Sequence, residues 1–108
     1  MSIPVELGDL PGEISRLAAN ALLVTNSEAG PPHVASMMVR SEGARLAMRA
    51  GRKTRANAAA RPDVTLVWPA ASEPGYCLIV DAVAIDATPE TFLVHPTAAV
   101  LHRLAEDS

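Results

Sequence analysis

The residues best suited to chemistry lie in one short basic segment, Arg49 to Arg61, with the sequence RAGRKTRANAAAR. It holds five of the nine basic residues, including Lys53, and no acid. Residues 56–60 favour a short helix, which places Gly51-Arg52-Lys53-Thr54 at or just before its first turn. Cations there oppose the helix dipole, whereas free N–H groups, a hydroxyl and two cations bind phosphate well. The pattern predicts an anion site, with a cofactor phosphate as the expected ligand; the alternative is a solvated basic helix surface.

The composition limits what surrounds this segment. Of the 108 residues, 49% are hydrophobic but only 3% are aromatic, so the core must be built from Val, Leu, Ala, Ile and Met. We expect a single domain over residues 1–108, small enough that pairing with a second copy would complete its core. The net charge of −3 and a pI near 5.5 argue against general nucleic-acid binding.

The compartment is also predicted from simple features. The one cysteine, Cys77, fits a reducing cytosol. The sequence MSIPVELGDLPGEI lacks the basic and apolar regions of a signal peptide. No apolar run approaches the length of a membrane span. We therefore expect a cytoplasmic protein with no membrane association.

Turn residues and apolar alternation divide the chain into short elements. The expected helices cover residues 10–20, 56–60 and 96–105, and the expected strands cover residues 21–25, 33–40, 45–49, 64–68, 76–86 and 91–94. Most of these strands are joined by hairpin turns. The predicted fold is mainly β, a six-stranded antiparallel barrel with an N-terminal helix, a short helix after the third strand and a C-terminal helix packed outside.

This order of elements resembles the FMN-binding split β-barrel family typified by pyridoxamine 5′-phosphate oxidase. The resemblance runs from about Leu22 to Ala87, over LLVTNSEAGPPHVASMMV, LAMRAGRKTRANAAARPDVTLVW and YCLIVDAVAID. In that family an Arg-Lys pair before a short helix holds the flavin phosphate, and Arg52-Lys53 match it, with Asn57 and Pro62 in the expected places. The resemblance implies the fold, an FMN cofactor, and a homodimer with the ring at the subunit interface.

A flavin would supply the redox chemistry, so no catalytic side chain is required and we predict none. Met37, Met38, Met48 and Trp68 suit the wall of a planar ring, and they suit a protein core equally well. The family sets strand backbone against the ring, which here implies residues 36–38. The predicted cofactor-binding residues are Ser36, Met37, Met38, Met48, Arg49, Gly51, Arg52, Lys53, Thr54 and Trp68.

The remaining polar residues favour structural roles. His33, His95 and His102 show no metal-ligand spacing with one another, with a cysteine or with an acid, so we expect no metal site. Cys77 lies in an apolar strand and is expected to be a small buried residue that does not act as a nucleophile.

Several residues depart from the family pattern, and these departures exclude one activity. Ala35 stands where the oxidase has a phosphate-binding arginine, Ala47 where it has a threonine, and Cys77 where it has a glutamine. The C-terminal arginine and histidine for the substrate phosphate have no counterpart in HRLAEDS. Oxidation of vitamin B6 is therefore rejected.

Three hypotheses remain. The first is an FMN-dependent oxidoreductase or flavin reductase working as a homodimer. The second is an enzyme of the same fold that uses the deazaflavin F420, which the Ala- and Arg-rich composition suggests through a high-GC source. The third is a cofactor-free split-barrel dimer with a binding or structural role, which Ala35, Ala47 and Cys77 favour. Haem binding would need an axial histidine, and His33 alone lies in the barrel strands.

Overall fold

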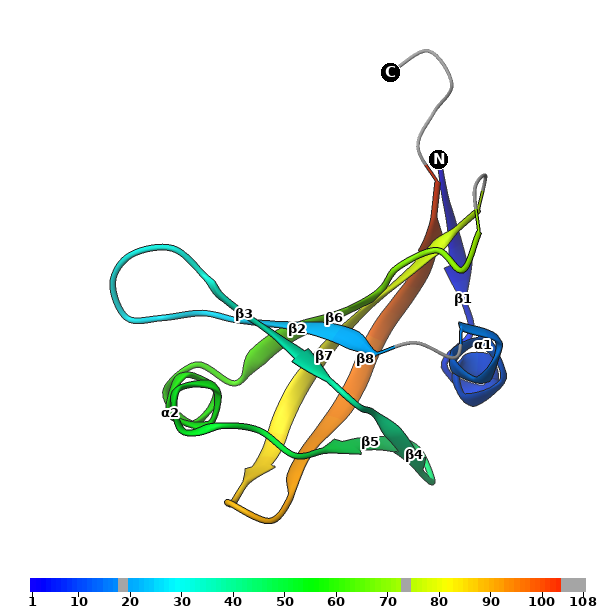
Figure 1. Ribbon diagram of the computed structural model, residues 1–108. Helices are drawn as coiled ribbons and strands as arrows, with labels where there is room; N and C mark the ends of the chain where they lie inside the picture. The colour runs from blue at the N-terminus through cyan, green and yellow to red at the C-terminus, as the bar shows by residue number, and fades with distance from the viewer. Residues whose placement is uncertain (18–19, 73–74, 104–108) are drawn as a thin grey trace.

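The computed structural model describes residues 1–17, 20–72 and 75–103. They form one strongly curled antiparallel sheet with two α-helices packed against it (Figure 1). The strands are β1 (Ser2–Val5), β2 (Ala21–Thr25), β3 (His33–Met37), β4 (Arg40–Glu42), β5 (Arg45–Met48), β6 (Asp63–Trp68), β7 (Cys77–Ala87) and β8 (Phe92–His102). A single 3-10 turn, η1 (Leu7–Asp9), leads into α1 (Leu10–Leu17), and α2 (Arg52–Ala60) joins β5 to β6.

The order of the strands explains why the barrel is split. The sheet runs β3-β2-β6-β7-β8-β5-β4, and β1 pairs with the C-terminal part of β8. Its two end strands, β3 and β4, are consecutive in the chain, so the polypeptide passes through Met38 and Val39 from one end of the sheet to the other (Figure 1). The barrel is therefore split between β3 and β4: the chain itself connects these two strands, but they are not hydrogen-bonded neighbours in the sheet.

Alternation along the strands builds the core. Val64, Leu66 and Trp68 of β6 point inward, as do Leu78 and Val80 of β7, which pair with neighbouring β6 residues. Phe92 and Trp68 are the large aromatic side chains of a core that otherwise consists of aliphatic residues, methionines and alanines. The composition therefore predicted the kind of core correctly.

Most elements lie where the sequence predicted them. The strand at residues 21–25 has the expected bounds, and those at 45–49, 64–68 and 76–86 are displaced by one residue at most at either end. The strand expected over residues 33–40 ends at Met37, and Arg40 begins β4. The first helix is described to Leu17; the expectation for residues 18 and 19 lies outside the described residues, and Asn20 is not helical.

The last element corrects the prediction. Residues 96–102 continue β8, where a helix over 96–105 was expected; residues 104 and 105 lie outside the described residues. Pro96 pairs with Ala82 beside a shift in the β7–β8 register, a position where a strand tolerates a missing N–H group. Pairing with β7 on one side and β1 on the other outweighs the helix propensity of the alanines.

The sheet thus has eight strands where six were expected. The two that were missed are short edge elements. β1 contains a proline and is recognisable only by its pairing with β8, and β4 has only three exposed residues. The fold class, a mainly β split barrel with flanking helices, is confirmed.

Candidate functional site

The start of α2 has the geometry expected of an anion site. Gly51 occupies the N-cap position, and no side chain caps the first turn. The side chains of Arg52 and Lys53 are exposed, whereas Thr54 is buried. Gly51 has an ordinary extended conformation, and a Cβ placed there would meet nothing within 4 Å. The first turn therefore has no side-chain cap, has open space beside Gly51 and carries two exposed cations, which are the features of an anion site.

A hydrogen bond holds this helix against the sheet. Asn57 Nδ2 donates to Oγ1 of Thr25 over 3.2 Å, and Thr25 is fully buried on β2. Ala58, on the same side of the helix, is also buried. The helix start is thus positioned by its second turn, which is fixed to β2, the strand next to the β3 end of the sheet.

A hollow of about 300 Å³ lies where the chain crosses between the two ends of the sheet. Its lining residues are Ser36, Met37, Met38, Arg40 and Arg49. They come from the end of β3, the start of β4 and the residue after β5. Met38 is 80% exposed. An apolar hollow with two arginines among its lining residues suits an apolar ligand that carries negative charge.

The predicted cofactor-binding residues fall into three places. Ser36, Met37, Met38 and Arg49 line the hollow. Gly51, Arg52, Lys53 and Thr54 form the start of α2. Met48 and Trp68 lie in the core with 1% of their surface exposed, which is the alternative that the sequence left open for them.

Arg40 is the lining residue that sequence reasoning missed. It was expected to end a strand, and it begins β4 instead. The Met-Met-Val stretch before it looks like a continuous strand, which hid the break between β3 and β4. In the structure Arg40 pairs with Ala47 in the β4–β5 hairpin and lines the hollow with Arg49.

The basic residues around the site have few acidic partners. Among the described residues the ion pairs are Arg16 with Glu13 at 3.3 Å and Arg40 with Glu42 at 3.1 Å. Arg49, Arg52, Lys53 and Arg55 therefore form no ion pair with the described part of the chain, although Arg55 Nε donates to the Gly51 carbonyl over 3.3 Å. Clustered cations at a helix start, without counter-charges, fit an anionic ligand.

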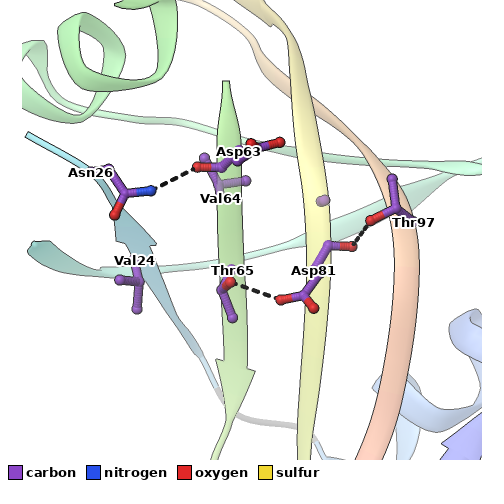
Figure 2. A pocket seen from close by; sticks show the side chains of 8 residues that line it. Val24, Asn26, Asp63, Val64, Thr65, Asp81 and Thr97 are labelled. Carbon is purple, nitrogen blue, oxygen red and sulfur yellow. Dashed lines mark hydrogen bonds between the residues drawn. The ribbon is translucent and has the colours of Figure 1, made fainter. Parts of the chain in front are cut away.

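A second hollow, of about 240 Å³, lies on the outer face of the sheet (Figure 2). Thr65 Oγ1 donates to Asp81 Oδ1 over 2.9 Å, and Thr97 Oγ1 donates to the Asp81 carbonyl over 3.1 Å. Asn26 Nδ2 donates to the Asp63 carbonyl over 3.4 Å. Figure 2 shows these polar side chains arriving from neighbouring strands. One of these hydrogen bonds joins two side chains and two go to backbone carbonyls, and all three connect neighbouring strands.

Two searches of the described residues gave negative results. No group of three or more His, Cys, Asp or Glu side chains is arranged to hold a metal ion in residues 1–17, 20–72 and 75–103. Across the same described ranges, no helix has the length and apolar character needed to cross a membrane.

Part of the sequence matches two mycobacterial proteins. Over 59 residues the chain is 48% identical to an uncharacterised protein of Mycobacterium bovis, and equally to one of Mycobacterium tuberculosis. The match covers 49% of this chain and 42% of each relative. The matched part is thus less than half the length of these curated relatives. No family model matches the sequence.

Solved structures share the architecture. A candidate pyridoxamine 5′-phosphate oxidase of Listeria innocua aligns with a TM-score of 0.67 at 13% identity, covering 85% of this chain and 97% of its own. An F420 reductase aligns at 0.64 with 19% identity, covering 75% and 88%. The FAD-binding protein of Mycobacterium smegmatis aligns at 0.62 with 16% identity, covering 95% and 100%. The chain therefore has the split β-barrel fold of pyridoxamine 5′-phosphate oxidase-like and flavin-type cofactor-binding proteins.

Proposed function

We propose that this protein is an FMN-binding oxidoreductase of the pyridoxamine 5′-phosphate oxidase-like kind. The observation that carries the proposal is the uncapped start of α2. Its first turn has no side-chain cap, and Arg52 and Lys53 form no ion pair within the described residues. An apolar hollow lined by Arg49 lies only a few residues earlier in the chain. An FMN molecule would place its phosphate at the start of α2 and its ring at the hollow, and so would use both features.

The residues divide into two roles. Arg52 and Lys53 neutralise the flavin phosphate, and the amides at the start of α2, including that of Thr54, donate hydrogen bonds to it. The ring lies against the backbone of residues 36–38. When bound, the flavin supplies the hydride or electron transfer, and the chain holds and orients it. The buried positions of Met48 and Trp68 give them a packing role behind the site.

The same proposal includes a homodimer. Leu22, Val67, Ile79 and Val100 are paired in register across β2, β6, β7 and β8, so their side chains form one row on the outer face of the sheet. Leu22 is 39% exposed, and Val34 on neighbouring β3 is 54% exposed. An apolar row on the face opposite the core calls for a partner. A second copy would cover it and place the two cofactor sites at the interface.

The compartment and the extent of the unit complete the proposal. We place the protein in the cytoplasm, where its one cysteine remains reduced. Residues 1–108 act as one split-barrel domain, whose sheet carries the apolar row and whose helix α2 carries the proposed phosphate site.

Two alternatives have support from particular observations. The F420 reductase among the structural neighbours favours an F420-dependent enzyme. The cofactor-free dimer is favoured by Ala47, which is completely buried, and by Ala35, which is half-buried, because neither offers a polar contact to a ligand.

Titration of the purified protein with FMN tests the proposal directly. Flavin absorbance in the preparation, or a saturable change in FMN fluorescence, is expected. The double variant Arg52→Ala, Lys53→Ala should weaken FMN binding by about a hundredfold, since two charge-assisted contacts are lost. Arg16→Ala, an exposed arginine on α1, is the matched control and should bind normally.

The outcomes separate the three hypotheses. Binding of F420 in preference to FMN, with the same dependence on Arg52 and Lys53, would replace the cofactor while keeping the site. A folded dimer that binds neither FMN nor F420 would contradict the proposal and favour the hypothesis of a cofactor-free split-barrel dimer.

A further inference from the structure

We propose that Arg40 and Arg49 make the bound flavin easier to reduce, because both line the hollow that receives its ring. This inference rests on the proposed function, which sets the ring at the hollow. It gives a role to Arg40, which neither the sequence pattern nor the proposed phosphate site requires.

The residues that line the hollow give it charge of one sign. Arg40 and Arg49 are both among them, and no acidic side chain is among the described lining residues. The other three lining residues are a serine and two methionines, which carry no charge. Arg49 has no ion-pair partner within the described part of the chain, whereas Arg40 Nη2 lies 3.1 Å from Glu42 Oε2. A ring in the hollow is therefore exposed to a positive field.

The two redox states of a flavin ring differ in charge. The oxidised ring is neutral, and uptake of two electrons and one proton leaves the reduced ring with one negative charge. Positive charge near the ring therefore stabilises the reduced form more than the oxidised form. Tighter binding of the reduced form raises the reduction potential of the cofactor, since binding and reduction are thermodynamically linked. The two arginines should thus make bound FMN a stronger electron acceptor.

Water and Glu42 set the size of this effect. The side chains of Arg40 and Glu42 are 60% and 49% exposed, so water screens their charges in the free protein. A ring seated in the hollow of about 300 Å³ displaces water, which strengthens its interaction with the nearby arginines. Glu42 is not among the lining residues, so it offsets the charge of Arg40 only in part.

The midpoint potential of FMN bound to the protein tests the inference. It is measured at saturating FMN by anaerobic titration with dithionite against a reference dye. Arg40→Gln should lower the affinity for reduced relative to oxidised FMN about tenfold, which lowers the potential by about 30 mV for a two-electron couple. Arg49→Gln should lower it at least as much, because no described acid offsets Arg49. Glu42→Gln should raise the potential, because the charge that opposes Arg40 is removed.

The signs of these shifts separate an electrostatic role from a structural one. Arg40→Gln and Glu42→Gln break the same ion pair, so a structural disturbance would move the potential in the same direction in both. Shifts of the same sign, or an unchanged potential in Arg40→Gln, would overturn the inference. Arg16→Gln, in the other ion pair among the described residues, should leave the potential unchanged. A shift in this control as large as that of Arg40→Gln would assign the effect to net charge and would also overturn the inference.

Failure of this inference and failure of the flavin proposal are distinguishable, because FMN binding is measured before the potential. If the variants bind FMN and the potential does not follow the charges, the inference fails and the flavin proposal stands. If Arg40→Gln weakens the binding of oxidised and reduced FMN equally, Arg40 only holds the cofactor and the inference is overturned. If the unaltered protein does not bind FMN, the flavin proposal fails and this inference fails with it.

Discussion

Asn57 on α2 and Thr25 on β2 are joined by a hydrogen bond of 3.2 Å from Nδ2 to Oγ1, across 32 residues of sequence. Thr25 is completely buried, so its hydroxyl has no water with which to replace the amide. The bond fixes the helix whose first turn carries Arg52 and Lys53. It therefore connects the core of the sheet to the position of the proposed phosphate site.

Removing the amide should affect stability and binding together. Asn57→Ala leaves a buried hydroxyl without its partner, and we expect a loss of about 1–3 kcal/mol in the free energy of unfolding. FMN affinity should also fall, because α2 is less firmly positioned. Thr25→Val, which removes the hydroxyl and keeps the shape, should partly restore the stability of Asn57→Ala in a double-mutant cycle. Urea unfolding measures the first effect and FMN titration the second. Additive losses in the cycle would contradict the coupling.

An acid at the N-cap of α2 should move stability and FMN binding in opposite directions. Gly51→Asp caps the helix and complements its dipole, and the site has room for the side chain, so stability should rise by about 0.5–1 kcal/mol. The added carboxylate should repel the flavin phosphate and weaken FMN at least tenfold. Gly51→Asn caps without charge and should bind FMN much more tightly than Gly51→Asp. Equal FMN affinity in the two variants would place the phosphate elsewhere.

The methionines of the sequence-predicted ring wall should separate into core and surface. Met48→Ala should destabilise the protein by about 2–5 kcal/mol, since the side chain is buried. Met38→Ala should leave stability nearly unchanged, because Met38 is 80% exposed. It should weaken FMN binding. Thermal unfolding and FMN titration of both variants distinguish the roles. A Met38 variant as unstable as the Met48 variant would show that Met38 packs in a core formed with a partner.

A charge on the outer row should dissociate the proposed dimer. Ile79→Lys places an ammonium group in the row formed with Leu22, Val67 and Val100, and burying it against a second copy is costly. Sedimentation should show a folded monomer. Ile85→Lys, on the same strand at a position already 47% exposed, should remain dimeric. An unchanged mass for Ile79→Lys would assign the interface to another surface.

The sequence by itself determined much of the local structure and the position of the cations at the start of α2. Alternation fixed which residues of the strand at 64–68 and of the strand that follows face the core, because the period of a strand is two. The basic segment before a run of alanines located the start of α2 and its cations, because helix propensity and charge are local properties.

Only the tertiary structure decided the rest. Residues 96–102 have weak local preference, and pairing with β7 and β1 makes them a strand. The same pairing brings Ser2 Oγ within 3.0 Å of His102 Nδ1 from the opposite end of the sequence. The hollow lies where the chain passes from β3 to β4 at opposite ends of the sheet order. The pairing of Arg40 with Ala47 in the β4–β5 hairpin brings Arg40 toward Arg49. Sequence patterns carry no information on such long-range pairing, because it depends on which strands meet.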